Sequence, residues 1–134
     1  MSTRVRSAAI TLLLAAGLVA GCSGQATPLR VEIKIHYSHF EPSALTVPHG
    51  VPVIFLLVNE DPIDHEWLIG DAAFHERHRT GTEAHHGARP NEISIPPLKE
   101  IETTLTFGAP GTMQYICHLP GHEAYGMVGT LTIT

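Results

Sequence analysis

The sequence TMQYICHLPGHEAYGMVGTLTIT, residues 112–134, places two expected β-strands on either side of a short loop. The strands TMQYICH and MVGTLTIT contain β-branched and aromatic residues, which favour extended backbone. Between them, Cys117, His122 and Met127 are spaced five residues apart. Because such a loop joins neighbouring strands, it holds a thiolate, an imidazole and a thioether close to one another.

These three side chains suit a soft metal ion. Sulfur ligands select copper, zinc or iron–sulfur clusters, and two His, one Cys and a weak axial Met form the type 1, blue-copper site. The second His must come from elsewhere in the chain. His65 is the natural donor, because its segment NEDPIDHEWLIG follows the apolar run VPVIFLLVN. The sequence therefore predicts one type 1 copper per chain, bound by His65, Cys117, His122 and Met127.

Residues 30–134 resemble the cupredoxin family in the order of these side chains. In cupredoxins one His lies just after a core strand, and the Cys, the second His and the Met follow on the loop that joins the last two strands. His65, Cys117, His122 and Met127 match this order. The loop spacing resembles rusticyanin and the type 1 sites of multicopper oxidases more than plastocyanin. HEWLIGD and CHLPGHEAYGM together look like small periplasmic cupredoxins associated with copper tolerance.

Three other interpretations of Cys117 are open. A lone buried Cys is usually an inert small hydrophobic residue. A structural zinc site generally uses four Cys or His ligands and would not need Met127. A catalytic Cys–His pair takes its two residues from distant elements, whereas His118 and His122 lie very near Cys117 in an extended segment. The ordered set of four ligands favours copper over these alternatives.

Two residues depart from the cupredoxin pattern. Many cupredoxins have Asn or Ser after the upstream His, where it helps to pin the Cys loop, and this sequence has Glu66. Multicopper oxidases have a His before the Cys, where this sequence has Ile116, and no His-x-His pair occurs in the chain. A trinuclear oxygen-reducing centre cannot be assembled from these residues, so we expect no enzyme activity from this chain alone.

The N-terminus predicts an exported protein. Arg4 and Arg6 precede an apolar run that is too short to span a bilayer comfortably, which is typical of a signal peptide over residues 1–21. The run ends in LVAGC, which resembles a bacterial lipobox, so Cys22 is the expected lipidation site; ordinary secretion is the alternative. Residues 22–28 would form a flexible linker. We expect a lipoprotein that is anchored to a membrane by lipid only and faces the periplasm or the cell exterior.

The remaining residues, 29–134, are enough for one domain with a hydrophobic core. One Cys is used at the N-terminus and one in the loop, so no intramolecular disulfide is available. Without Arg4 and Arg6 the chain has six Lys and Arg against thirteen Asp and Glu, a formal net charge of −7. This charge argues against nucleic acid as a partner, because nucleic-acid binding needs a basic surface.

The pattern of short strands predicts an all-β domain. Apolar and polar residues alternate in RVEIKIH, which is typical of a strand with one solvated face. VPVIFLLVN is continuously apolar, as in a strand buried in a sandwich core. Short strands with turn signals in a chain of this size indicate an antiparallel Greek-key β-sandwich. The expected strands cover residues 30–36, 43–50, 51–59, 92–97, 99–107, 112–118 and 127–134.

A second group of histidines lies in the segment AFHERHRTGTEAHHGARPNE, which contains His75, His78, His85 and His86. The segment is expected to be a long loop with one helical turn at its start. Imidazole suits copper and zinc, so these four histidines form a possible auxiliary metal site; a solvated polar loop is the alternative. His118 should point away from the Cys117 side of its strand, and we do not expect it to be a ligand.

The sequence is compatible with several classes of physiological role. A type 1 copper site supports a one-electron carrier that works with a redox protein partner. The resemblance to copper-tolerance proteins and the histidine-rich segment support a protein that binds or sequesters copper and exchanges it with a copper donor or acceptor. An enzyme would need a second catalytic centre, which the sequence does not reveal, and an accessory subunit of a redox enzyme is the weakest of these expectations.

Overall fold

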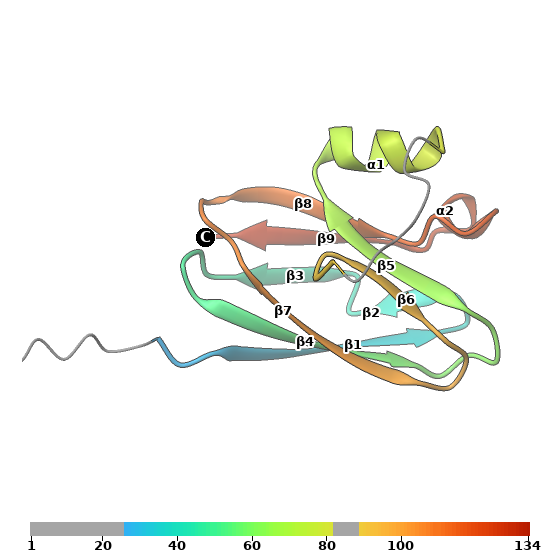
Figure 1. Ribbon diagram of the computed structural model, residues 1–134, viewed down its shortest axis with the longest axis horizontal. Helices are drawn as coiled ribbons and strands as arrows, with labels where there is room; N and C mark the ends of the chain where they lie inside the picture. Colours follow the sequence, from blue (N-terminus) through green and yellow to red (C-terminus); the bar gives the residue numbers. More distant parts are fainter. Residues whose placement is uncertain (1–25, 82–88) are drawn as a thin grey trace, which may run out of the picture.

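The computed structural model describes residues 26–81 and 89–134, which form two packed β-sheets with two short helices (Figure 1). Three predictions fall outside these residues: the signal peptide, lipidation at Cys22, and metal binding by His85 and His86. Within the described part of the chain, no helix is long and apolar enough to cross a bilayer.

Nine strands in the described residues divide between the two sheets. The first sheet comprises β1 (Leu29–His36), β2 (His39–Glu41), β4 (Pro52–Asn59) and β7 (Glu100–Thr106), in the order β2-β1-β4-β7. The second sheet comprises β3 (Ala44–Val47), β5 (His65–Gly70), β6 (Glu92–Ile95), β8 (Gly111–Ile116) and β9 (Val128–Ile133), in the order β3-β9-β8-β5-β6. Helix α1 (Ala72–Arg79) follows β5, and helix α2 (His122–Tyr125) lies between β8 and β9.

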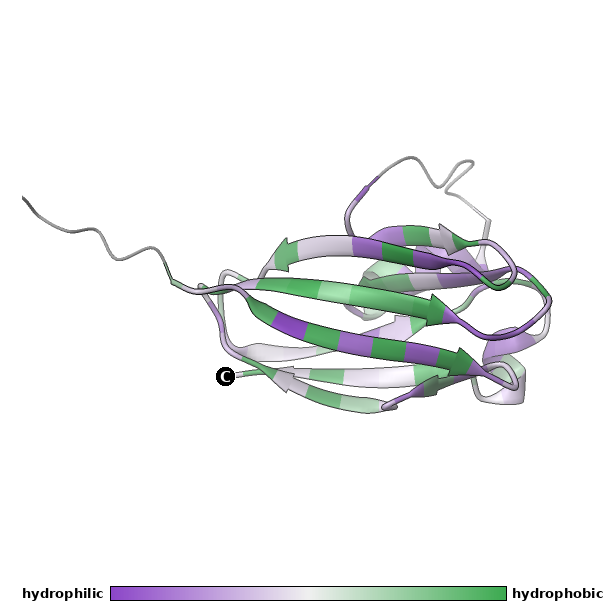
Figure 2. Cartoon of the chain, turned by 90° about the horizontal axis from the view of Figure 1, so that it is seen from below, coloured by the Kyte–Doolittle hydropathy of each residue, from purple (hydrophilic) through white to green (hydrophobic). Residues whose placement is uncertain are grey.

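β1 and β4 show how the sequence pattern builds the core. Hydrophilic and hydrophobic residues alternate along β1, beside the mostly apolar β4 (Figure 2), and Ile33 and Ile35 of β1 are buried. In β4, Val53, Phe55 and Leu57 are fully buried, while the residues between them are only half-buried. The predicted burial of this strand is therefore correct for its inner face, and its outer face is partly solvated.

Crossings between the sheets place two pairs of strands parallel. β1 and β4 run parallel, as do β3 and β9, and the other five pairs are antiparallel. The chain passes from the first sheet to the second after β2 and returns after β3, so strands that run in the same direction become neighbours. The predicted all-β sandwich is confirmed, but each of its sheets is mixed and not purely antiparallel as expected.

Four elements were not among the expected strands. β2 and β5 are strands that the sequence pattern does not single out, and α1 and α2 are helices in segments expected to be mainly loop. β5 begins with His65 and Glu66, so it lacks an alternating pattern, yet all six of its residues are buried. It is a central strand of the second sheet, and α1 packs against β5 and β8. The burial of β5 therefore depends on tertiary contacts that its own sequence does not encode.

The Tyr115 ring on β8 lies across Gly129 on β9, where the two residues are direct partners. A methyl group at Gly129 would overlap that ring, so we expect Gly129→Ala to destabilise the fold by about 1–3 kcal/mol, as overpacking does elsewhere. Gly108→Ala is the control, because a methyl group there meets nothing within 4 Å. Urea unfolding measures both variants, and equal stability of the two would contradict the proposed overlap.

Candidate metal centre

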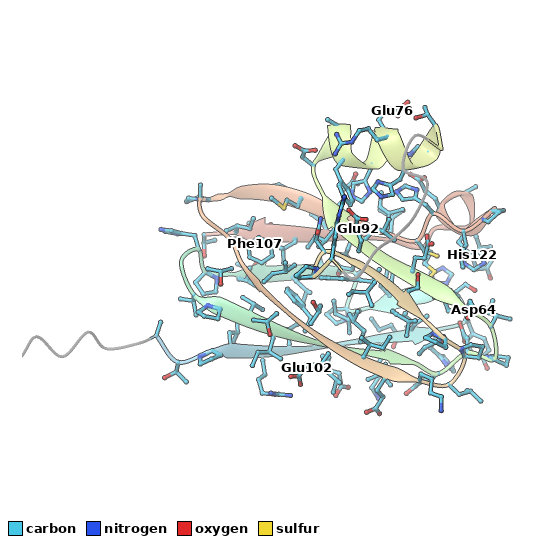
Figure 3. All side chains as sticks on the ribbon, in the orientation of Figure 1. Asp64, Glu76, Glu92, Glu102, Phe107 and His122 are labelled. Atoms are coloured by element: carbon cyan, nitrogen blue, oxygen red, sulfur yellow. The ribbon has the colours of Figure 1, made fainter. Side chains whose placement is uncertain are left out.

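Two segments bring the predicted ligands to one end of the sandwich. β5 begins at His65, and the loop between β8 and β9 carries Cys117, His122 and Met127. Figure 1 shows this loop at the end of the molecule opposite the C-terminus, and Figure 3 shows His122 at that end, where Asp64 of the loop between β4 and β5 also lies. The ligands therefore come from a rigid strand and from one loop held between two paired strands.

The ligand atoms of His65, Cys117 and His122 all lie within 4.8 Å of one another. His65 Nδ1 is 3.3 Å from His122 Nδ1, and Cys117 Sγ is also 3.3 Å from His122 Nδ1. Two imidazole nitrogens and one sulfur thus face a common point. This arrangement fits a copper ion with two nitrogen ligands and one thiolate.

Met127 is fully buried, and its backbone is hydrogen-bonded to two residues of this cluster. Its carbonyl oxygen accepts a hydrogen bond of 3.2 Å from the Cys117 N–H, and its own N–H donates 3.0 Å to the His122 carbonyl oxygen. These bonds hold the start of β9 against the end of β8. The backbone therefore carries the Met127 thioether beside the other three predicted ligands.

Two glycines shape the loop. Gly121 (φ +86°) precedes α2 and Gly126 (φ +108°) ends it, and both lie in the left-handed region where a side chain would be strained. The His122 N–H donates 3.0 Å to the Leu119 carbonyl oxygen, which closes the turn. The tight turn at Pro120 and Gly121 therefore directs His122 back toward Cys117.

The Cys117 thiol is fully buried, and burial raises its pKa to about 11. Its sulfur accepts a 3.3 Å hydrogen bond from the backbone N–H of Glu66 and another from the N–H of Leu119. A thiolate at this site would need a positive charge beside it, which a metal ion supplies. The Glu66 backbone also links β5 to the Cys loop, although its side chain differs from the usual Asn or Ser.

Asp61 is a partner of the centre that sequence reasoning missed. His65 Nε2 donates a 2.9 Å hydrogen bond to Asp61 Oδ2, and the backbone N–H groups of Tyr37 and Ser38 each donate to the same carboxylate at 2.8 Å. Burial alone would raise the pKa of Asp61, but these hydrogen bonds hold it below its ordinary value. The position of Asp61, four residues before a ligand His, was the only available signal.

The Asp61 contact determines which His65 nitrogen can bind a metal. Burial lowers the pKa of His65, so the ring is neutral at neutral pH. Its proton lies on Nε2, where Asp61 accepts it, and Nδ1 presents its lone pair to the cluster. Ligand histidines in metal sites commonly have such a partner, which orients the ring and raises its basicity.

The histidines predicted as an auxiliary site do not join this cluster. His75 and His78 lie on α1, on the other side of the Cys loop, and His75 Nδ1 is 2.9 Å from His118 Nε2. His118 points away from Cys117, as predicted, and contacts α1. The contact between His75 and His118 was not predicted, because it depends on how α1 packs.

The comparisons with known proteins agree with this geometry. A family model described as a cupredoxin-like domain matches residues 8–133. The chain is 28% identical to the copper-resistant cuproprotein CopI of Pseudomonas aeruginosa, in an alignment that covers 90% of this chain and 93% of that protein.

Solved structures of two auracyanins are similar to this fold. The structure of auracyanin B matches with a TM-score of 0.66 and 26% identity, covering 79% of this chain and 88% of that one. Auracyanin A, described as a "blue" copper protein from Chloroflexus aurantiacus, matches with a TM-score of 0.63 and 26% identity, covering 81% of this chain and all of that one.

Proposed function

The chain belongs to the cupredoxin-like family, and from this premise we propose that His65, Cys117, His122 and Met127 hold one type 1 copper in a one-electron carrier. The observation that carries the proposal is the convergence of two imidazole nitrogens and one buried sulfur within 4.8 Å. Copper at such a site supplies one-electron exchange between Cu(I) and Cu(II).

The protein contributes a ligand framework that is held in place before metal binds. His65 is fixed by Asp61, the Cys117 sulfur by two backbone N–H groups, and Met127 by backbone hydrogen bonds across the loop. A framework that changes little between the two copper oxidation states lowers the reorganisation that electron transfer requires. His122 is only half-buried, so it offers the route by which a redox protein partner would exchange electrons.

Reconstitution with Cu(II) tests this proposal. The full chain should take up one tightly bound copper and show an intense visible sulfur-to-copper charge-transfer band, because the Cys117 thiolate is a direct ligand. Absorption spectra during titration with Cu(II) measure both the band and the stoichiometry. A colourless copper complex would exclude a type 1 site.

A role in copper tolerance is the second candidate, and the similarity to CopI over nearly the full length of both proteins favours it. In this role the same site would bind or pass on copper outside the cytoplasm. The predicted signal peptide and Cys22 lipid anchor would keep the protein facing the periplasm or the cell exterior. Growth of a deletion strain in excess copper, measured with its respiratory electron flux, separates the roles: copper sensitivity with normal flux supports tolerance, and reduced flux without sensitivity supports the carrier.

Replacing Asp61 with Asn should raise the reduction potential of the copper centre and weaken metal binding about 10–100-fold, as loss of a ligand's hydrogen-bonding partner does in other metal sites. The carboxylate makes the His65 imidazole more basic, which favours Cu(II), and a neutral amide would remove this effect. Asp64→Asn is the matched control, because Asp64 is exposed on the same loop. Redox titration and metal competition measure the two effects; equal potentials in the two variants would contradict the role of Asp61.

A further inference from the structure

Three imidazoles gather on the far side of the Cys loop from the first centre. His75 and His78 are three residues apart on α1, and His118 follows Cys117 directly. His75 is fully buried, and the His118 side chain is only 6% exposed. His75 Nδ1 lies 2.9 Å from His118 Nε2, and the His78 and His118 rings are parallel with their centroids 5.7 Å apart.

Each of these rings has its other nitrogen bound to an oxygen. His75 Nε2 lies 3.0 Å from the Gln114 carbonyl oxygen, and His78 Nδ1 lies 2.8 Å from the Phe74 carbonyl oxygen. His118 Nδ1 lies 3.2 Å from the Glu123 carboxylate. Because an oxygen of this kind only accepts, each of these nitrogens carries the proton of its ring.

In the neutral rings, the remaining nitrogens of His75 and His118 therefore carry lone pairs. His75 Nδ1 and His118 Nε2 then face each other at 2.9 Å as two acceptors, which is unfavourable unless a positive species lies between them. The first centre has the same pattern, with His65 Nδ1 facing His122 Nδ1 and its Nε2 held by a carboxylate. Ligand histidines usually have a carbonyl or carboxylate on the second nitrogen, as all three rings have here.

The surroundings would accept a cation. Glu123 supplies a carboxylate beside His118 and is itself held by Arg79, whose Nε donates to both carboxylate oxygens at 2.9 Å. This ion pair connects α1 to α2 next to the ligand loop. A hollow of about 380 Å³, lined by residues that include His78, His118 and Glu123, opens beside the rings. An ion could therefore reach His78 and His118 from solvent without passing through the first centre.

We propose that His75 and His118, with His78 beside them, form a second metal site for an imidazole-preferring cation of the copper and zinc class. His75 would bind through Nδ1 and His118 through Nε2. These two atoms are 2.9 Å apart, and a small increase in this distance would admit the ion. His78 lies on the same face of α1 as His75, with its ring stacked beside that of His118. This site does not rest on the proposed function, because none of its residues is a predicted ligand of the type 1 centre.

Zinc titration of the full chain, already loaded with one copper, tests the second site. Calorimetry should detect one equivalent of Zn²⁺ in the unmodified protein. His75→Gln and His118→Gln should each weaken its binding at least about 10-fold while the visible copper band stays unchanged. His49→Gln is the matched control, because His49 contacts Thr134 at the opposite end of the sandwich and should change neither reading.

A second measurement tests the site even if the histidine variants fail to fold. Nitrogen-15 NMR of the unmodified chain should show Zn²⁺ shifting His75 Nδ1 and His118 Nε2, in addition to any change at His65 and His122 if copper is absent from the first centre. Glu123→Gln keeps all three rings and should weaken zinc about 10–100-fold. Three results would each overturn the proposal: no second equivalent of zinc, zinc binding that is unchanged in both histidine variants, or unshifted His75 and His118 nitrogens. In that case the two rings would share a proton instead of a metal ion.

Discussion

Cys117→Ser should abolish the visible charge-transfer band of the copper-loaded protein, because the band requires a thiolate bound to the metal and serine has none. The side chain is fully buried and the two residues have similar size, so the fold should survive. Absorption spectra of the two proteins after equal copper loading measure the effect. This is the largest spectroscopic change that any single substitution in the chain should produce.

Met127→Leu is the informative comparison for this experiment. It removes a weak axial ligand and keeps a buried apolar side chain, so the site should remain coloured. The reduction potential should rise, because the thioether stabilises Cu(II) more than Cu(I). Redox titration followed at the visible band measures it. Equal loss of the band in Cys117→Ser and Met127→Leu would contradict the distinction between equatorial and axial ligands.

The grouping of His65, Cys117 and His122 could be predicted from the sequence because most of its geometry is local. Cys117, His122 and Met127 lie on one loop between two strands that pair along their whole length, so their spacing nearly determines their positions. The turn at Gly121 needs only the conformational freedom of that residue. His65 was predicted from its place after a core strand, and the structure brings it within the same 4.8 Å cluster.

The parts that could not be predicted depend on contacts between distant segments. Asp61 reaches His65 only because the turn at Tyr37 and Ser38 donates two N–H groups to its carboxylate. The sequence of β5 has no alternating pattern that would predict a strand. Its burial is determined by the neighbouring strands and by α1. The alternation of a strand predicted the direction of His118, but the His75 ring that it meets is placed by the packing of α1.

Trp67→Ala should cost about 3–5 kcal/mol of folding free energy, the usual range for removing a buried aromatic side chain. Trp67 is fully buried on β5, where its ring lies 4.9 Å from Phe55 of the first sheet and 6.3 Å from Tyr115 of the second. It therefore fills the space between the two sheets, and alanine would leave a cavity there. Urea unfolding with an unchanged slope would measure a loss of stability alone.

Trp67→Phe separates the loss of volume from any loss of hydrogen bonding. The indole Nε1–H of Trp67 has no hydrogen-bond partner among the described residues, so phenylalanine gives up no such bond and keeps an aromatic ring in contact with Phe55. It should cost clearly less than Trp67→Ala. Both variants should keep the visible copper band at temperatures where they remain folded, because Trp67 is not a ligand. If Trp67→Phe destabilised the protein as much as Trp67→Ala, a specific contact of the indole rather than the filling of the core would hold the two sheets together.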